Sequence, residues 1–301
     1  MSNSTSTLVL GAGELGIPVI KSLAANAPPN SVLKVLLRPS TSPGHQALLS
    51  ELHTLNVLVT YGNIATDSVD VLADLFRGHT TIISCVGFAA GPGTQLKLAR
   101  AVLAAGVPRY MPWQFGVDYD VIGRGSPQDL FDEQLGVRDL LRAQTHTLWR
   151  IVSTGMFTSF LFEPSFGVVD LEAGVCRALG GWETAVTVTT PEDIGMLTAR
   201  IAGETWDGSG VVYTAGDTLT YGALADTVER ILEKTVEREV WSVERLVKEL
   251  KDDPQNGMKK YRAVFGMGKG VSWPIEGTYN FQKDVAVEGV ESWLKRHLNN
   301  Q

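Results

Sequence analysis

The first half of the chain alternates short apolar, β-branched runs with amphipathic stretches of helical period. This alternation predicts parallel strands joined by crossover helices, because each strand-sized run is followed by a segment with the 3.6-residue period of a helix. We expect strands at residues 7–10, 32–37, 57–61, 80–86, 109–112 and 148–153, and helices at 15–25, 46–55, 68–76, 95–105 and 127–143. The predicted fold class is α/β, with a doubly wound parallel sheet.

The regular alternation ends after Ser153. The sequence Thr190-Pro191-Glu192-Asp193 is a helix start signal, and further helices are expected near residues 223–234 and 243–251. Residues 251–270 mix charge, glycine and methionine without a clear period, which predicts a mobile surface loop or lid. We therefore expect a first domain at residues 1–153 and a smaller C-terminal α/β lobe at 154–301, with some C-terminal segments packing back on the first domain.

Composition excludes several classes of protein. The chain has 301 residues, of which 44% are hydrophobic and 20% charged, so a disordered chain is excluded. A net charge of -7 gives no positive surplus for a phosphate backbone, which argues against nucleic acid as the main partner. The two cysteines, Cys85 and Cys176, show no metal-ligand spacing and argue for a reducing, cytoplasmic location without a metal. The apolar runs are strand-sized, so we expect no membrane span and no signal peptide.

A glycine motif follows the first predicted strand directly and precedes the first predicted helix. Gly11 permits a tight turn, Gly13 lets the backbone approach a pyrophosphate, and Gly16 allows the helix to pack on the strand. Free N–H groups at the helix start suit the anion. Glu14 would oppose the pyrophosphate if it pointed inward, so it is expected to face solvent or a neighbouring loop. The predicted dinucleotide contacts of this turn are Gly11, Ala12, Gly13, Glu14, Leu15 and Gly16.

The second predicted strand ends at Arg38, where an NAD-specific site usually carries an acid. A guanidinium at this position can form charge-assisted hydrogen bonds to a 2′-phosphate. The alternative is an ordinary solvated arginine. The position favours NADP(H) as the cofactor.

Five further features, read with the glycine motif and Arg38, point to one family. They are Ile83-Ser84-Cys85-Val86-Gly87, Gln95 at the head of a helix, Ala105-Gly106-Val107, Met111-Pro112-Trp113-Gln114-Phe115-Gly116-Val117-Asp118, and Pro191-Glu192-Asp193-Ile194-Gly195. Together they resemble the NmrA-like and isoflavone-reductase-like branch of the atypical short-chain dehydrogenases, as a divergent, fungal-type member. The resemblance covers nearly the whole chain.

The resemblance implies an NADP(H)-binding Rossmann domain, a smaller substrate lobe and a cleft between them. The cofactor contacts that it adds are Val86, Gly87, Gln95, Met156 and Phe157, and the candidate substrate contacts are Trp113, Gln114, Asp118 and Phe160. Family reductases usually read Pro-Ser-Glu-Phe-Gly where this chain has a tryptophan and a glutamine. Trp113 is therefore expected either to shape the substrate pocket or to pack in the core beside Phe115.

The family's catalytic lysine is absent. Alignment of the helix after the Phe-Gly-x-Asp motif puts Gln134 in its place, and no lysine occurs between Lys97 and Lys234. An amide can orient a carbonyl but has no proton to give at neutral pH. Tyr119 is the candidate proton donor, with packing on its loop as the alternative. The pair Tyr279-x-x-x-Lys283 matches the spacing of ordinary short-chain dehydrogenases but lies near the C-terminus, so we interpret it as coincidence.

Three functions remain open at this point. The first is an NADPH-dependent reductase of a small, largely apolar aromatic or nitrogen-containing secondary metabolite, with an iminium-like acceptor that needs no acid. Acids that could stabilise such a cation are Asp118, Asp132, Glu133 and Glu163, with solvated surface groups as the alternative for most of them. The second is an NADP(H)-bound cyclase or redox-neutral catalyst, and the third is an NmrA-like dinucleotide-sensing regulator. For both enzymatic functions, the expected partner is a small-molecule substrate. The protein is expected to be a monomer or a homodimer.

Overall fold

The computed structural model describes residues 5–88 and 91–299. Its contacts divide the chain into two compact units, each built from three segments. Unit 1 comprises Met1–Gln114, Glu133–Val152 and Ile194–Val212, and unit 2 comprises Phe115–Asp132, Ser153–Asp193 and Tyr213–Gln301. The expected boundary after residue 153 falls within one residue of one of these junctions, but the units interleave along the chain. The assignment of one cofactor domain and one substrate lobe stays a prediction.

Unit 1 contains a seven-stranded sheet in the order β11-β6-β5-β4-β1-β2-β3. Its strands are β1 (Ser6–Leu10), β2 (Val32–Leu37), β3 (Leu58–Tyr61), β4 (Thr81–Ser84), β5 (Arg109–Met111), β6 (Leu148–Ser153) and β11 (Gly210–Tyr213). The pairings among β1 to β6 are parallel. The order reverses between β1 and β4, which is the switch point of a doubly wound sheet. The predicted fold class and all six predicted strands are confirmed.

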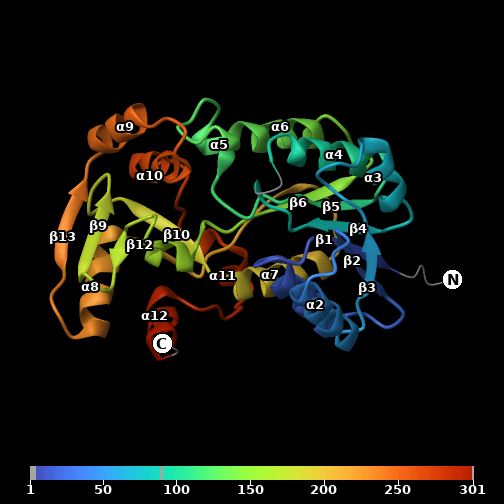
Figure 1. The fold of residues 1–301 in the computed structure, drawn as a ribbon, viewed down its shortest axis with the longest axis horizontal. Coiled ribbons are helices and arrows are strands. Elements are labelled where there is room, and N and C mark those ends of the chain that lie inside the picture. The colour runs from blue at the N-terminus through green and yellow to red at the C-terminus, as the bar shows by residue number, and fades with distance from the viewer. Residues whose placement is uncertain (1–4, 89–90, 300–301) are drawn as a thin grey trace. The chain divides into compact units, whose positions relative to one another are not determined.

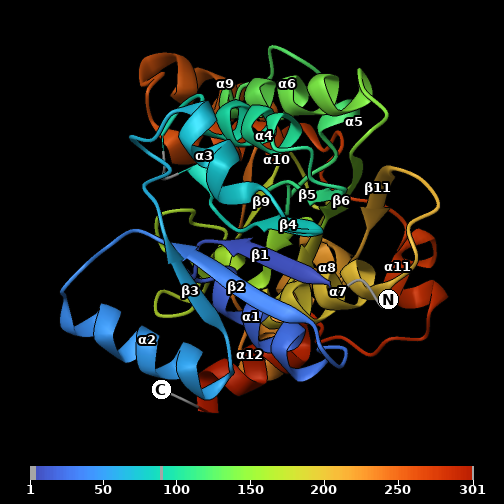
Figure 2. The same ribbon diagram turned by 90° about the vertical axis from the view of Figure 1, so that its right-hand side faces the viewer.

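Helices cover both faces of this sheet, with α3, α4 and α6 on one face and α1, α2 and α7 on the other (Figure 2). Their bounds are α1 (Gly16–Ala25), α2 (Pro43–Thr54), α3 (Val69–Phe76), α4 (Thr94–Ala104), α6 (Leu130–Arg142) and α7 (Pro191–Gly203). Ser42 and Ser68 cap α2 and α3, each accepting a hydrogen bond from a backbone N–H in the first turn. Leu8, Ile82 and Tyr110 belong to the core under α3 and α4.

Two predicted helix starts are wrong by three residues. The helix predicted from residue 46 begins at Pro43, and the helix predicted from residue 127 begins three residues later than expected. The signal Ser126-Pro127 places a helix start at residue 127, but α6 begins at Leu130. The hydroxyl of Ser126 donates to the carbonyl of Gln128, and the N–H of Phe131 bonds to that same carbonyl. These short-range bonds form a turn before the helix, so the cap-like residues belong to the turn.

Unit 2 contains two small sheets, in the orders β12-β10-β7 and β13-β9-β8. The strands are β7 (Met156–Phe157), β8 (Val169–Asp170), β9 (Val175–Leu179), β10 (Ala185–Thr189), β12 (Asp217–Thr220) and β13 (Glu237–Trp241). The helices are α5 (Tyr119–Ile122), η2 (Thr158–Phe162), α8 (Tyr221–Leu232), α9 (Val243–Asp252), α10 (Gly257–Met267), η3 (Ile275–Gly277), α11 (Tyr279–Gln282) and α12 (Val290–Asn299). Both α8 and α10 contact β9 (Figure 1).

The prediction of a mobile loop at residues 251–270 is wrong, because α10 occupies most of this segment. The side chain of Asn256 caps the helix by accepting from the N–H of Lys259, and Gly268 ends it with a left-handed backbone. Ala263, Val264 and Phe265 are buried. The helix therefore owes its place to packing against α9 and β9 rather than to a long amphipathic pattern. Within residues 5–88 and 91–299, no helix is long and apolar enough to span a bilayer.

Candidate functional site

The glycine turn lies between β1 and α1 at the carboxyl edge of the sheet in unit 1. Gly11 has a φ of 87°, and its N–H donates to the carbonyl of Leu36 at 3.2 Å. A Cβ on Gly16 would overlap the carbonyl oxygen of Gly11, so this position requires glycine. A Cβ on Gly13 would meet no atom within 4 Å, so the backbone there borders open space that a pyrophosphate could approach. Glu14 is exposed, as expected.

Arg38 lies one residue beyond the end of β2 and is exposed. The hydrogen bond from Gly11 to Leu36 ties the glycine turn to the end of β2. Arg38 follows two residues after Leu36, so its backbone lies near the turn on the β2 side. This arrangement fits a dinucleotide with a phosphate on its adenosine ribose.

The ends of β4 and β5 carry the next predicted contacts. Val86 lies against the glycine turn, since a Cβ on Gly11 would be 3.1 Å from its Cγ2. A Cβ on Gly87 would be 3.1 Å from Cζ2 of Trp113, so the indole packs directly on this glycine. The rings of Phe88 and Trp113 meet edge to face at 4.7 Å. Trp113 thus borders the predicted cofactor strand ends within unit 1, and its role in the pocket stays a prediction.

Gln95 supports the turn after β4. Its Nε2 donates to the carbonyl of Val86 at 2.8 Å, and the side chain is 3% exposed. The N–H groups of Gly93, Gln95 and Leu96 donate to the carboxylate of Glu133 at 2.9, 2.7 and 3.2 Å. Glu133 therefore holds the N-terminus of α4, where a negative charge is favoured. Sequence reasoning missed this contact, because the carboxylate lies about forty residues along the chain from the helix that it caps.

Gln114, Gln134 and Arg138 form a buried polar group in unit 1, and all three are fully buried. Nε2 of Gln114 donates to the backbone carbonyl of Gln134 at 2.9 Å, and Nε of Arg138 donates to Oε1 of Gln114 at 2.8 Å. Among the described residues, neither amide atom of the Gln134 side chain has a hydrogen-bond partner. A buried amide without a partner is costly, so the Gln134 side chain carries an energetic penalty in this structure.

Unit 2 holds the predicted proton donor and two of the predicted cofactor contacts, Met156 and Phe157. The carbonyl of Gly116 accepts from the N–H groups of Thr154 and Gly155, both at 3.0 Å. Met156 and Phe157 follow directly and form β7. Tyr119 is 2% exposed, and its hydroxyl lies 2.8 Å from the position that a Cβ on Gly116 would take. The backbone thus brings the Tyr119 segment beside the segment that carries Met156 and Phe157.

Aromatic side chains from four segments form a cluster in unit 2. Tyr119 and Phe131 lie 5.0 Å apart between ring centroids, and Phe131 lies 6.0 Å from Tyr261. Phe160 lies 6.0 Å from Tyr261 and 4.6 Å from Phe166. Burial raises the pKa of Tyr261 to about 12. Tyr261 was not among the predicted site residues, because residue 261 falls in the segment predicted to be a loop.

The acids predicted to stabilise a cation all accept hydrogen bonds inside their own unit. Asp118, which is 8% exposed, caps α5 through its Oδ1 and accepts from the hydroxyl of Tyr213 at 2.7 Å. Asp132 accepts from the N–H of Gly125, and Glu163 accepts from the hydroxyl of Ser165, both at 3.0 Å. With Glu133 at α4, each acid already has a structural contact. Asp118 also lines a cavity of about 280 Å³ in unit 2, together with Tyr213 and Trp273.

The other residues considered in the sequence are the pair Tyr279 and Lys283 and the two cysteines. Tyr279 begins the four-residue helix α11 in unit 2, and Lys283 follows it. Cys85 and Cys176 are both buried and form no disulfide. The described part of the chain contains no group of three His, Cys, Asp or Glu side chains that could hold a metal ion.

A doubly wound parallel sheet with a glycine turn at its switch point defines a dinucleotide-binding α/β protein of the Rossmann class. The model of the NmrA-like family matches residues 2–292 of this chain. The chain is 48% identical over 302 residues to an NmrA-like family domain-containing oxidoreductase of Gibberella moniliformis, covering 97% of this chain and 98% of that protein. This protein belongs to the NmrA-like family, which confirms the resemblance seen in the sequence.

Solved structures share the same fold. A crystal structure of isoflavone reductase superposes with a TM-score of 0.82 at 19% identity, covering 98% of this chain and 100% of that one. The binary complex of leucoanthocyanidin reductase with NADPH from Vitis vinifera also gives a TM-score of 0.82 at 19% identity, covering 98% and 99%. At this identity the likeness establishes the fold.

Proposed function

We propose that this protein is an NADP(H)-dependent reductase of a small, largely apolar aromatic or nitrogen-containing secondary metabolite. The observation that carries the proposal is the pairing of the Gly11–Gly16 turn with Arg38 at the end of the neighbouring strand. The similar fungal protein is named an oxidoreductase, and a protein of the same fold was solved with NADPH. Both agree with the proposal.

The residues of unit 1 would divide the work of holding NADP(H). The turn at Gly11, Gly13 and Gly16 offers backbone N–H groups to the pyrophosphate, and Arg38 offers a guanidinium to the 2′-phosphate. Val86 and Gly87, braced by Gln95, form the neighbouring wall. When bound, the cofactor would supply the hydride, and the chain would supply orientation and exclusion of water.

The chemistry that we propose rests on the alignment of Gln134 with the family's catalytic lysine, which the resemblance implies. Hydride addition to a ketone or enone creates an oxyanion that needs a proton, and an amide cannot give one. Addition to an iminium-like acceptor neutralises a charge and needs no acid. We propose this acceptor class, because its reduction requires no proton from the position of Gln134. A neutral carbonyl acceptor protonated by Tyr119 is the alternative.

The cofactor proposal is tested by titrating NADPH and NADH into the wild type and Arg38→Ala. We expect NADPH to bind more tightly than NADH and Arg38→Ala to weaken NADPH by about 10- to 100-fold, the value of a charge-assisted contact of about 1.5–3 kcal/mol. Lys34→Ala removes the same charge from the same strand and serves as the control, with little change expected. Equal affinity of the wild type for both cofactors would contradict the proposal.

The acceptor class is tested by the pH dependence of the rate, with NADPH and an acceptor of known pKa. We expect the rate to follow the protonated fraction of the acceptor and to be unchanged in Tyr119→Phe. If Tyr119→Phe abolishes turnover of a neutral ketone or enone, Tyr119 is the acid and the iminium proposal is wrong.

Gln134 also favours a second candidate, a redox-neutral catalyst that keeps NADP(H) bound, because loss of the lysine removes the usual acid. The two candidates differ in stoichiometry. A reductase oxidises one NADPH for each product molecule, whereas a redox-neutral catalyst forms product without net NADPH consumption. Absence of any turnover, combined with a protein partner whose binding depends on NADP(H), would favour the regulator instead.

A further inference from the structure

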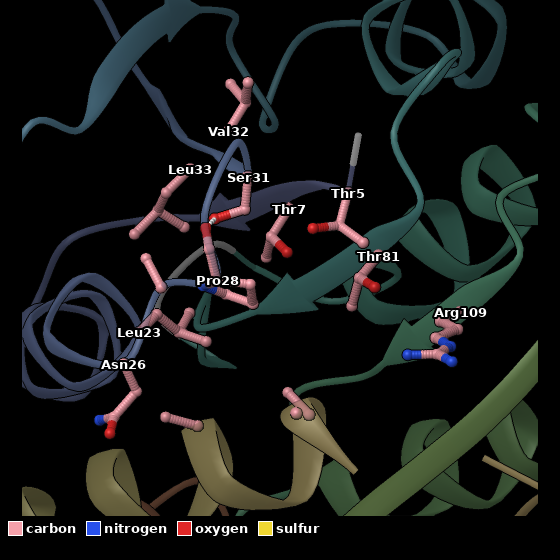
Figure 3. Close-up of a pocket in the computed structure, with 14 residues that line it drawn as sticks. Thr5, Thr7, Leu23, Asn26, Pro28, Ser31, Val32, Leu33, Thr81 and Arg109 are labelled. Carbon is pink, nitrogen blue, oxygen red and sulfur yellow. Dashed lines mark hydrogen bonds between the residues drawn. The ribbon is translucent and has the colours of Figure 1, made fainter. Parts of the chain in front are cut away.

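Unit 1 contains a second candidate binding site at the amino edge of the sheet, the edge opposite the glycine turn. A cavity of about 260 Å³ opens there between the first residues of the strands and the last residues of α1 and α7 (Figure 3). Thr7 lies in it, four residues before Gly11, so about 13 Å of strand separates the cavity from the glycine turn. The cavity is therefore distinct from the proposed NADP(H) site.

Strand register brings three polar side chains into one row on the cavity wall. Thr7 of β1 pairs with Thr81 of β4, and Thr81 pairs with Arg109 of β5. Residues paired in this way point to the same face of a sheet. The next residues of these strands, Leu8, Ile82 and Tyr110, are buried in the core of the opposite face. Figure 3 shows Thr7, Thr81 and Arg109 on neighbouring strands around the same opening.

Two of these side chains, Arg109 and Thr81, have no polar partner among the described residues. Among the described residues, the Arg109 guanidinium forms no hydrogen bond and no ion pair, and it stacks on Trp206 at 5.4 Å from the ring centroid. Arg150 stacks on Trp206 at the same distance but lies 3.5 Å from Glu204 and 3.7 Å from Asp207. The Thr81 hydroxyl likewise forms no hydrogen bond to any described residue, although Thr81 is only 6% exposed.

The rest of the lining defines the ligand class. Apolar side chains form much of the remaining lining, from Leu23, Pro28, Val32, Leu33, Ala199 and Ala202, and the polar residues Thr5, Asn26 and Ser31 also line it. The helices α1 and α7 both end at the cavity, and a helix C-terminus carries about half a negative charge, which disfavours a dianion. One guanidinium therefore suits a single negative charge. A water molecule takes up about 30 Å³ of the liquid, so the volume fits a ligand of about nine non-hydrogen atoms.

We propose that this cavity binds a small monocarboxylate with an apolar body, such as an aromatic or short aliphatic acid. The carboxylate accepts hydrogen bonds from Arg109 and from the hydroxyls of Thr7 and Thr81, and the apolar body lies against Leu23, Leu33 and the alanines of α7. The site is independent of the reductase proposal, since none of its residues belongs to the predicted cofactor or substrate contacts.

The test is calorimetric titration of benzoate into the full-length protein saturated with NADPH. We expect benzoate to bind. Benzamide should bind at least about tenfold more weakly because it has no negative charge, and inorganic phosphate should also bind at least about tenfold more weakly because its negative charge is larger than one. Arg109→Ala should weaken benzoate at least about tenfold, the loss expected for a hydrogen bond to a charged group. Thr81→Val, which keeps the side-chain shape, should weaken it about fivefold.

Arg150→Ala is the matched control, because it removes the other guanidinium that stacks on Trp206 and should leave benzoate affinity unchanged. Circular dichroism checks that each variant is folded, and Thr81→Val decides the result if Arg109→Ala does not fold. The proposal is overturned if the wild type does not bind benzoate or if NADPH displaces it. It is also overturned if Arg150→Ala lowers the affinity as much as Arg109→Ala.

Discussion

In unit 1, the residues proposed to meet the cofactor stand at the ends of neighbouring parallel strands, where backbone hydrogen bonds fix their positions. Gly11 is tied to β2, and Gly87 and Trp113 follow β4 and β5. In unit 2, Tyr119 and Phe160 belong to a cluster of rings from distant segments, held by side-chain packing. We infer that unit 1 is sensitive to changes that move the backbone and that unit 2 is sensitive to loss of side-chain volume.

The largest effect is expected from Phe131→Ala, which removes the ring between Tyr119 and Tyr261. Phe131 is 2% exposed, so the change should lower the free energy of unfolding by about 3–5 kcal/mol. Trp113→Ala in unit 1 is the matched change, and it should cost less because Trp113 is partly exposed at a strand end. Urea unfolding followed by far-UV circular dichroism measures both. Equal losses in the two variants would remove the proposed difference between the units.

The second-largest effect is expected from a substitution that moves the backbone of the glycine turn in unit 1. Gly16→Ala puts a methyl group onto the carbonyl of Gly11, so the turn must open. We expect a loss of about 1–3 kcal/mol in stability and at least a 100-fold loss, roughly 2.7 kcal/mol, in NADPH affinity. Gly13→Ala is the control: its methyl group meets no atom, so the melting temperature should stay unchanged while NADPH binds more weakly. A Gly16→Ala protein that binds NADPH like the wild type contradicts the site.

A smaller effect is expected from Glu133→Gln. The carboxylate accepts three N–H groups at the start of α4, and the amide keeps the shape but loses the charge. The variant should lose about 1–2 kcal/mol of stability at pH 7. Asp129→Asn in unit 2 breaks an ion pair with Lys260 that is 2.8 Å long but largely exposed on the aspartate side, and should cost less than about 1 kcal/mol. The reverse order of these losses would show that Glu133 does not stabilise α4.

The same contrast explains which features could be predicted from the sequence. In unit 1, β2 and β6 are mainly apolar runs, each interrupted by one basic residue, so 32–37 and 148–153 were predicted to the residue. The glycine turn was predictable because all its determinants are local. In unit 2, no individual strand was located. β7 and β8 have only two residues each and depend on pairing with distant segments. The other four strands have four or five residues, and they follow no regular alternation with helices.

Long-range contacts limited the prediction of the candidate site. The cap of α4 by Glu133 and the contact of Tyr261 with Phe131 join segments that no local pattern connects. The cavity at Arg109 likewise depends on strand register, which aligns Thr7, Thr81 and Arg109 across three strands. A local pattern can also mislead: Ser126-Pro127 is typical of a helix start, but these residues form a turn before the helix.

The smallest effect compares two buried tyrosines, Tyr110 in unit 1 and Tyr261 in unit 2. Burial raises the pKa of both phenols, to about 12 for Tyr261 and further for Tyr110. Above pH 10 the unfolded chain releases these protons before the folded protein does. Stability is therefore complete below pH 10 and falls as the pH rises toward the folded pKa values.

Replacement of each tyrosine by phenylalanine should remove the part of the stability loss above pH 10 that this tyrosine causes. At pH 7 we expect Tyr110→Phe to be neutral or slightly stabilising, since the Tyr110 hydroxyl is buried and has no hydrogen-bond partner among the described residues. At pH 11 both variants should exceed the wild type by about 1 kcal/mol in free energy of unfolding, and Tyr110→Phe should gain at least as much as Tyr261→Phe. Urea unfolding at pH 7 to 11 measures this, with Tyr61→Phe as the exposed control. If Tyr61→Phe gains as much as Tyr110→Phe, burial is not the cause of the alkaline loss.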